Sequence, residues 1–420
     1  MRRLLLAVSC VLSAAPLSAQ VPAAEYAARR DSLAAAMSDG VLIAIGGHEP
    51  AEDFLSFYPN PSFYYLTGVT EPEAVLVIAK RRSAVAMTLF VQPRDPAREA
   101  WTGTRLGADG MTRATGIPAR AAEQLRPTLD SLLALGGTLS VVGDLPGEEF
   151  TTRDEQFVSS VHHDHPEVQI SNANALVEHL RTRHSGAELA LERKAIDITV
   201  RAQRDAISAI RPGVNEFEIQ ALIDYTFRRN GADRPSFATI VGSGPNSTAL
   251  HYSANDRFMQ GGDVVVMDIG ASYRGYAADV TRTVPVSGTF TPEQRAIYQV
   301  VRDAQHAAES VAKLGVTSAQ LDDAANRVLG AGLAKLGLIE SPEGVYDPGS
   351  AGCRRRIANG CAQLSLFYFH ALGHAIGLEV HDPTSYTIAP GNTFTLEPGL
   401  YIRPTVLDEL PDTPRNRAMI

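Results

Sequence analysis

The first half of the chain switches between helix-like and strand-like apolar patterns. The stretch from Ala23 to Met37 is amphipathic and predicts a helix, and the apolar run 41–46 predicts a strand that ends in a glycine turn. Strands that alternate with helices indicate an α/β domain, which we expect to end near His184. The same patterns predict further strands at 62–68, 74–78 and 88–91, and helices around 119–135 and 171–183.

The second half contains a pattern that occurs twice. Apolar residues recur with helical period over 186–210, and a second helix is predicted over 215–229. The turn between them, Gly213-Val214-Asn215, is echoed by Gly315-Val316-Thr317, which lies between a helix predicted at about 291–313 and another helix. Each half therefore reads helix, Gly-Val turn, helix, strands, which predicts a duplicated α+β domain with a site between its halves.

Two carboxylates interrupt the apolar pattern of residues 263–282. The valine-rich run that begins at Val264 predicts a buried strand, and a turn follows. If a hairpin is centred at Tyr273–Arg274, Asp268 and Asp279 face each other with Cβ atoms about 5 Å apart. Carboxylates that close repel each other unless a cation or a proton lies between them. The pattern favours a divalent cation over a solvated hairpin whose Asp residues point into water.

Further candidate ligands follow in the sequence. A Gly/Asn-rich loop delivers His251 just before the hairpin, and His370, His374 and His381 are interleaved with glycines. Ala371 follows the first of these three histidines, where a zincin helix would require Glu, so that motif is excluded. Glu397 leaves its predicted strand on the same face as the neighbouring threonines.

A site built from Asp, Asp, His and Glu offers mixed oxygen and nitrogen ligands. Such a set suits Mn²⁺, Co²⁺ or Zn²⁺, and carboxylates can bridge two ions. Two ions close together can activate a bridging water and polarise a carbonyl group. A Glu can serve as the base, and spare His residues can hydrogen-bond a tetrahedral intermediate. The chemistry predicted for this site is metal-assisted hydrolysis.

Composition narrows the choice of partners. The 420 residues carry a formal net charge of −9 and ordinary apolar and charged fractions. An acidic chain of this kind lacks the excess of basic residues that binding to nucleic acid or to an anionic membrane requires. Small molecules or peptides are therefore the expected ligands. Association of copies of the chain is left open.

The amino-terminal residues resemble a secretory signal peptide. Met1-Arg2-Arg3 precedes an apolar run, and small residues follow up to a cleavage site expected near Ala19. The apolar run is too short to span a bilayer, so we expect export without a membrane anchor, to a bacterial periplasm or beyond. In that compartment Cys353 and Cys361 are expected to form a local disulfide, with two free thiols as the alternative.

Taken together, these motifs resemble the pita-bread metallopeptidases, in the aminopeptidase P and prolidase branch. The resemblance implies a pseudo-twofold α+β catalytic domain at 185–420 behind a creatinase-type α/β domain at 20–184, with the signal at 1–19. It assigns metal binding to Asp268, Asp279, His374 and Glu397. It assigns substrate contact or stabilisation of the intermediate to His251, His370 and His381, with Glu397 also catalytic. Two divalent ions, foremost Mn²⁺, are the implied cofactors.

One ligand of that family has no match here. The family carries a fifth ligand, a Glu in an Arg-Ile-Glu-like motif on a final strand. The residues after Glu397-Pro398-Gly399 contain a single glutamate, Glu409, which lacks the motif. We therefore expect the sequence to be incomplete at its carboxyl end, and a protein of this length to bind its second metal poorly.

The resemblance implies an Xaa-Pro aminopeptidase, which removes an N-terminal residue from peptides whose second residue is proline. One alternative is a prolidase, which performs the same hydrolysis on Xaa-Pro dipeptides. Another is a non-catalytic pita-bread binding protein, which would apply if the chain truly ends at residue 420. A metal-free creatinase-like enzyme is disfavoured, because the Asp pair would then lack a cation.

Overall fold

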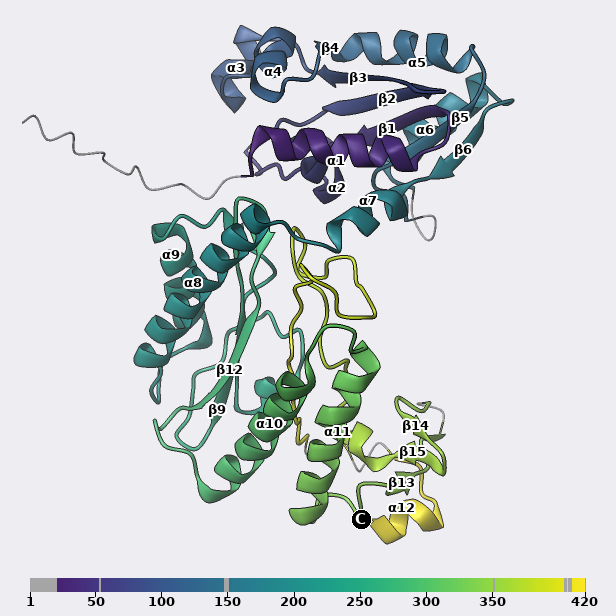
Figure 1. Cartoon of the computed structure of the whole chain (residues 1–420). Helices are drawn as coiled ribbons and strands as arrows, with labels where there is room; N and C mark the ends of the chain where they lie inside the picture. Colours follow the sequence, from purple (N-terminus) through teal and green to yellow (C-terminus); the bar gives the residue numbers. More distant parts are fainter. Residues whose placement is uncertain are drawn as a thin grey trace, which may run out of the picture.

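The structure is a computed structural model that describes residues 21–52, 54–146, 151–349, 352–403, 406 and 410–419. Figure 1 shows an amino-terminal part built on one sheet and a carboxyl-terminal part in which helices pack on smaller sheets. The predicted signal at residues 1–19 and the unmatched Glu409 lie outside the described residues. Within them, no helix is both long enough and apolar enough to cross a membrane.

A six-stranded sheet forms the centre of the amino-terminal part, in the order β4-β3-β2-β1-β5-β6. Every residue of β1 is buried. Leu42 and Ala44 pack with the helices on one face, while Val41 and Ile43 belong to a second apolar cluster on the other face. Helices therefore cover both faces, as the α/β prediction required. The strands are β1 (Gly40–Ile45), β2 (Val75–Arg81), β3 (Ala84–Val91), β4 (Ala119–Ala121), β5 (Thr138–Val142) and β6 (Gln169–Asn172).

The predicted helix that begins at Ala23 is confirmed as α1, and the strands at 41–46, 74–78 and 88–91 are confirmed as β1, β2 and β3. The helix predicted around 119–135 starts later than expected, because residues 119–121 form strand β4. The helix predicted around 171–183 also starts later, because its first two residues belong to strand β6. The helices of this part are α1 (Ala23–Ala36), α2 (Pro61–Thr67), α3 (Pro96–Thr102), α4 (Gly107–Thr115), η1 (Ala122–Gln124), α5 (Leu125–Leu133), α6 (Arg153–Asp164) and α7 (Asn174–Arg181).

The strand predicted at 62–68 is wrong, because this segment forms the helix α2. The side chain of Asn60 accepts hydrogen bonds from the backbone N–H groups of Ser62 and Phe63, and Pro61 opens the helix. Gly68 ends it in the left-handed conformation, with φ of 68°. The start and stop signals on either side therefore decide the structure, although the aromatic residues between them favour a strand.

The duplicated pattern of the carboxyl-terminal part is confirmed by matching backbone contacts. The N–H of Gly213 donates to the carbonyl of Met259 at 2.8 Å, and the N–H of Gly315 donates to that of Ile388 at 2.8 Å. Each turn then leads into a helix that begins with a capping box, at Asn215 in the first half and at Thr317 in the second. Figure 1 shows the resulting helix pairs, α8 with α9 and α10 with α11.

Apolar residues of β9 face these helices. Val265, Met267 and Ile269 are buried in one core with residues of α8 and α9, which leaves Asp268 on the other face of the strand. The elements of the first half are α8 (Gly186–Ala209), α9 (Glu216–Arg229), β7 (Arg234–Pro235), β8 (Ile240–Ser243), η2 (Gly244–Thr248), β9 (Val264–Ile269), β10 (Ala271–Tyr273), β11 (Tyr276–Ala277) and β12 (Val280–Pro285).

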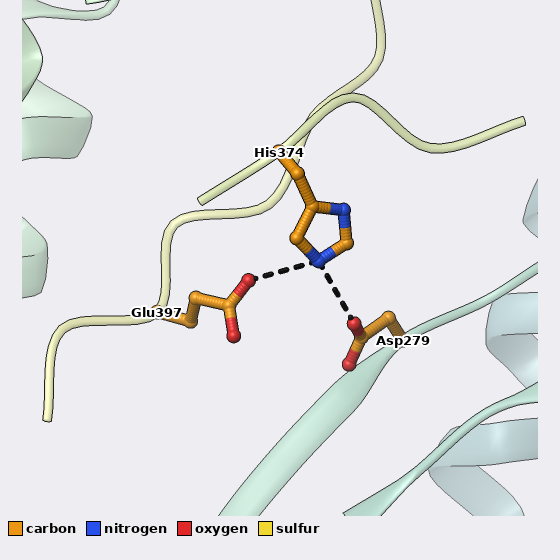
Figure 2. Close-up of side chains that lie close together, drawn as sticks. All are labelled: Asp279, His374 and Glu397. Carbon is orange, nitrogen blue, oxygen red and sulfur yellow. Dashed lines mark ion pairs between the residues drawn. The ribbon is translucent and has the colours of Figure 1, made fainter. Parts of the chain in front are cut away.

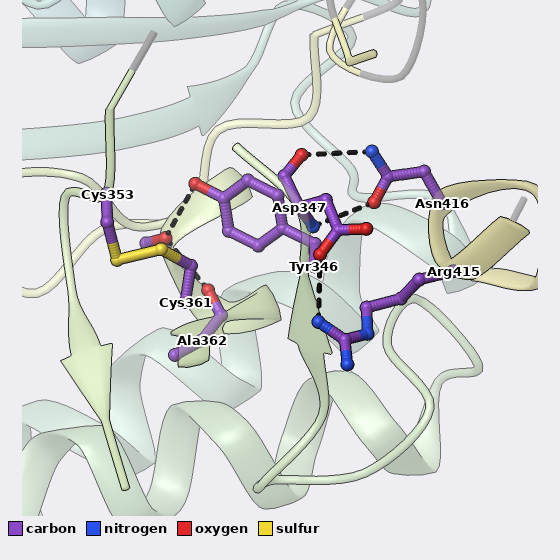
Figure 3. The surroundings of a disulfide bond; sticks show 8 residues. Tyr346, Asp347, Cys353, Cys361, Ala362, Arg415 and Asn416 are labelled. Carbon is purple, nitrogen blue, oxygen red and sulfur yellow. Dashed lines mark hydrogen bonds and ion pairs between the residues drawn. A yellow bond between two sulfur atoms is a disulfide. The ribbon is translucent and has the colours of Figure 1, made fainter. Parts of the chain in front are cut away.

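The second half also contains a small sheet that carries a disulfide. Cys353 and Cys361 form the predicted disulfide, with Cα atoms 5.5 Å apart (Figure 3). In the same region, Asp347 accepts a hydrogen bond from Arg415 at 2.8 Å and so connects this sheet to the last described helix. The elements of this half are α10 (Pro292–Val311), α11 (Ser318–Lys335), β13 (Val345–Tyr346), β14 (Arg356–Ile357), β15 (Gly360–Ala362), η4 (Gln363–Leu366) and α12 (Pro414–Met419).

Candidate metal centre

The hairpin that carries the two Asp residues turns one residue later than predicted. Arg274 and Gly275 have φ values of 51° and 84°, as a two-residue hairpin turn of type I′ requires. In the resulting register Asp268 pairs with Thr281, so the expectation that Asp268 directly faces Asp279 is wrong. Moving the turn by one residue changes the partner of Asp268 by two residues, from Asp279 to Thr281. Both carboxylates therefore still lie on the same face of the hairpin, as diagonal neighbours.

The environment of Asp268 opposes a free negative charge. Burial, and then the charge of Asp279, raises the pKa of the Asp268 carboxyl well above its ordinary value. Its Oδ1 atom is buried and has no hydrogen-bond partner among the described residues. A buried carboxylate oxygen without a donor, beside a second carboxylate, is the arrangement that a cation would relieve.

His374 reaches this face from the second half of the domain. Its segment runs beside the segment that carries Glu397: Thr395 donates from its N–H to the carbonyl of His374 at 2.9 Å, and Glu397 donates to that of Leu372 at 2.8 Å. The two backbones approach so closely at Gly373 that a Cβ there would lie 2.1 Å from the carbonyl oxygen of Thr395. The glycine before His374 therefore permits the close pairing that brings the imidazole and the Glu397 carboxylate together.

Asp279, His374 and Glu397 converge at a single point (Figure 2). The Nε2 atom of His374 lies 3.4 Å from Oδ2 of Asp279 and 3.1 Å from Oε1 of Glu397. Their potential ligand atoms all lie within 4.8 Å of one another. Burial lowers the pKa of His374, but hydrogen bonds with Asp279 and Glu397 outweigh it and raise the pKa to about 10. The two carboxylates therefore favour positive charge at this point, which a divalent cation would supply.

The orientation of His374 suits a metal ligand. Its Nδ1 atom lies 3.0 Å from the carbonyl oxygen of Ala375, an acceptor, so Nδ1 carries the hydrogen and Nε2 is directed at the carboxylates. Histidine ligands are typically held in this way by a hydrogen bond from the other ring nitrogen. The donor set of Asp268, Asp279, His374 and Glu397 therefore fits a divalent metal ion.

His370 lies beside this cluster and is held by two contacts. Its Nδ1 atom lies 2.8 Å from the carbonyl of Ala371, and its Nε2 atom lies 3.0 Å from the hydroxyl of Tyr401. Burial lowers the pKa of His370, so the ring is neutral near pH 7. With Nδ1 donating to the carbonyl, Nε2 accepts from Tyr401. Sequence reasoning missed Tyr401, although its place shortly after Glu397-Pro398-Gly399 was a usable signal.

His381 stands over the metal-ligand candidate His374, with ring centroids 4.3 Å apart. Burial and the neighbouring charge of His374 lower the pKa of His381, and the charge of His251 adds to this effect. His251 is exposed on the turn that follows η2. The structure therefore gathers the predicted histidines around the cluster.

Thr395 is a second residue whose role sequence reasoning missed. Its hydroxyl donates to Oε1 of Glu397 at 2.7 Å and accepts from the N–H of His374 at 3.0 Å. Glu397 and Thr395 thus lie on the same side of the backbone, as predicted, but residues 392–397 form a single bridge between Phe394 and Ala375 rather than a regular strand. Burial raises the pKa of Glu397, but hydrogen bonds from His374 and Thr395 outweigh it, and the net pKa is lowered. Glu397 is therefore ionised at neutral pH.

A cavity of about 620 Å³ adjoins the cluster, lined by His370 and His374. It extends toward α11, where Leu321 and Asp322 line it, and includes Arg355 near the disulfide. Asp279 and Glu397 do not line it. The cavity therefore lies next to the metal-ligand candidates rather than around them.

Comparison with known proteins identifies the family to which this geometry belongs. Residues 190–413 match the model of metallopeptidase family M24, and residues 26–140 match the aminopeptidase P N-terminal domain. The Xaa-Pro aminopeptidase of Escherichia coli K12 is 34% identical over 90% of this chain and 87% of that protein. The chain is a member of metallopeptidase family M24. Within that family it belongs to the aminopeptidase P branch.

Other members of the aminopeptidase P branch agree. Xaa-Pro aminopeptidase 3 of Rattus norvegicus is 29% identical over 90% of this chain and 76% of that protein. A zinc-substituted E. coli aminopeptidase P in complex with product superposes with a TM-score of 0.79 at 30% identity, covering 96% of this chain and 91% of that chain. These matches confirm the predicted pita-bread domain behind a creatinase-type domain, and they confirm a metallo-aminopeptidase. They do not favour the prolidase or the non-catalytic binder.

Proposed function

We propose that this protein hydrolyses the bond between an N-terminal residue and a following proline, with divalent metal ions held by Asp268, Asp279, His374 and Glu397. The observation that carries the proposal is the convergence of Asp279, His374 and Glu397 within 4.8 Å, from segments far apart in the sequence. The orphaned Oδ1 atom of Asp268 supplies an independent reason for a cation there. When bound, divalent ions supply an activated water and polarise the scissile carbonyl group.

The chain's own residues account for the remaining chemistry. The ionised carboxylate of Glu397 holds the proton that the attacking water loses and returns it to the leaving nitrogen of proline. Thr395 keeps that carboxylate in place through its 2.7 Å hydrogen bond. In this proposal His381, whose ring packs against that of His374, and His251 donate hydrogen bonds to the carbonyl oxygen as negative charge develops on it. His370, oriented by Tyr401, contacts the substrate.

Two finer features of the proposal concern the ion and the compartment. We propose Mn²⁺ as the native ion, since carboxylate oxygens dominate the ligand set, with Co²⁺ or Zn²⁺ as substitutes. We also propose export to the periplasm or beyond, supported by the signal-like residues 1–19 and by the Cys353–Cys361 disulfide. Amino-terminal sequencing of the mature protein from a fractionated cell tests the export. Association of copies of the chain stays a prediction.

A comparison of three peptides tests the activity. The protein, loaded with Mn²⁺, is assayed on a tripeptide with proline second, a matched tripeptide with alanine second, and an Xaa-Pro dipeptide. We expect release of the first residue from the proline tripeptide, much slower cleavage of the alanine tripeptide, and loss of activity with a chelator. Preference for the dipeptide would instead identify a prolidase. Bound metal without hydrolysis of any peptide would identify a binding protein.

A further inference from the structure

The segment that carries His381 has no regular secondary structure to fix it. Residues 376–382 form a series of bends between the paired segment that holds His374 and the loop that follows. The imidazole of His381 must nevertheless be placed accurately, because an error of about 1 Å in a reacting group can cost about 100-fold in rate. Some other contact must therefore hold this segment.

The carboxylate of Asp382, the residue directly after His381, makes these contacts. Its side chain is 2% exposed, and Oδ1 accepts hydrogen bonds from the N–H of Glu379 at 3.0 Å and from Nη2 of Arg181 at 2.5 Å. Its own N–H donates to the carbonyl of Ala375 at 3.0 Å. Asp382 thus ties the chain just after His381 back to Ala375 and Glu379, and so closes the bends that contain His381.

The positive charge of Arg181 compensates the buried negative charge of the Asp382 carboxylate. The side chain of Arg181 is 4% exposed, and its Nη2 atom also lies 2.6 Å from Oε2 of Glu379. Its Nη1 atom donates to the hydroxyl of Ser62 in α2 at 3.1 Å. The guanidinium therefore connects the His381 segment to a helix of the amino-terminal part.

Arg181 belongs to the amino-terminal part of the chain, whereas Asp382 belongs to the catalytic domain. Arg181 is the last residue of α7, and it precedes the segment matched by the M24 model, which starts at residue 190. Figure 1 shows α7 where the amino-terminal part meets the carboxyl-terminal part. A second basic side chain supports the same carboxylate, since Nε2 of His184 lies 3.9 Å from Oδ2 of Asp382.

We propose that Arg181 is a positioning residue for catalysis. Through Asp382, it fixes the backbone around His381 and so keeps that imidazole over the metal site. The amino-terminal part thereby contributes to turnover through a buried ion pair, without touching the substrate. This inference rests on the proposed function, because it requires His381 to act on the reacting carbonyl oxygen.

The test compares Arg181→Gln with the wild-type protein at saturating Mn²⁺. We expect kcat to fall about 10- to 100-fold, with KM changed little and metal content unchanged. Arg181→Lys keeps one charge but not the forked contacts, and it should fall between the two. The matched control is Arg183→Gln, which removes an exposed guanidinium two residues away and should leave kcat unchanged.

A double-mutant cycle with His381→Ala separates positioning from general destabilisation. If Arg181 acts through His381, Arg181→Gln should cost little further activity once the imidazole is gone. The proposal is overturned if folded, metal-loaded Arg181→Gln retains wild-type kcat, or if its loss is just as large in the His381→Ala background. If Arg181→Gln does not fold, the same cycle with Arg181→Lys decides. An inactive wild-type protein would instead refute the proposed function.

Discussion

His374 and Asp279 meet across the two halves of the catalytic domain, with Nε2 of the histidine 3.4 Å from Oδ2 of the aspartate. Asp279 stands just before β12 in the first half, whereas His374 belongs to the second half. The cluster therefore exists only when the two halves are packed together. An ion held at this point binds the folded chain far better than the unfolded chain, so metal binding and stability are coupled.

The first prediction follows from that coupling. Saturating Mn²⁺ should raise the melting temperature, because an ion at 100 times its dissociation constant stabilises the folded state by about 2.7 kcal/mol. Asp279→Ala should abolish the shift together with hydrolysis, whereas Asp323→Ala, on the exposed face of α11, should keep both. Differential scanning fluorimetry with and without a chelator measures the shift. An undiminished shift in Asp279→Ala would place the ion elsewhere.

The second prediction separates turnover from metal binding at His381. Its ring lies over His374 but is not one of the clustered ligand groups. His381→Ala should therefore lower kcat about 100- to 1,000-fold, as expected for loss of one donor to the developing oxyanion, while metal content stays near normal. Metal analysis beside steady-state kinetics checks both parts. Loss of the ion in this variant would make His381 a ligand instead.

The third prediction concerns the disulfide shown in Figure 3. Cys353 and Cys361 are separated by 8 positions, and constraining so short a loop in the unfolded chain contributes about 2 to 3 kcal/mol. The double substitution Cys353→Ser with Cys361→Ser should lower the free energy of unfolding by about that amount. Denaturant titrations of both proteins measure it. A reducing agent should destabilise the wild-type protein alone, and an equal effect on both would point to a cause other than this bond.

Sequence reasoning picked out the candidate ligand residues, three of which the structure brings together, but not the contacts that position them. Helical periodicity and the Gly-Val echo predicted the duplicated helix pairs, because amphipathic spacing is a local property of the chain. The register of the hairpin was misjudged by two residues, since it depends on which residues adopt positive φ, here Arg274 and Gly275. The pairing of Arg181 with Asp382 had no local signal, because it joins residues 201 positions apart.

The last prediction concerns pH and lies away from the metal site. His48 contacts two carboxylates, with Nε2 2.7 Å from Oδ1 of Asp154 and Nδ1 3.1 Å from Oε2 of Glu73. The hydrogen bond with Asp154, and then that with Glu73, raises the pKa of His48 to about 9, above its ordinary value of 6.5. The charged imidazole therefore stabilises the folded state fully below about pH 6.5, and this contribution is lost as the pH rises through 9.

Removing this imidazole should expose that dependence. His48→Gln should lower the free energy of unfolding by about 1 to 2 kcal/mol at pH 6, after allowance for the partial exposure of the site to solvent. The difference from the wild-type protein should shrink steadily between pH 7 and pH 10. His306→Gln, at an exposed position of α10 near Glu309, is the matched control and should show a much smaller difference. Denaturant titrations across this range measure both differences, and a difference for His48→Gln that does not vary with pH would show that the ring acts by packing rather than by charge.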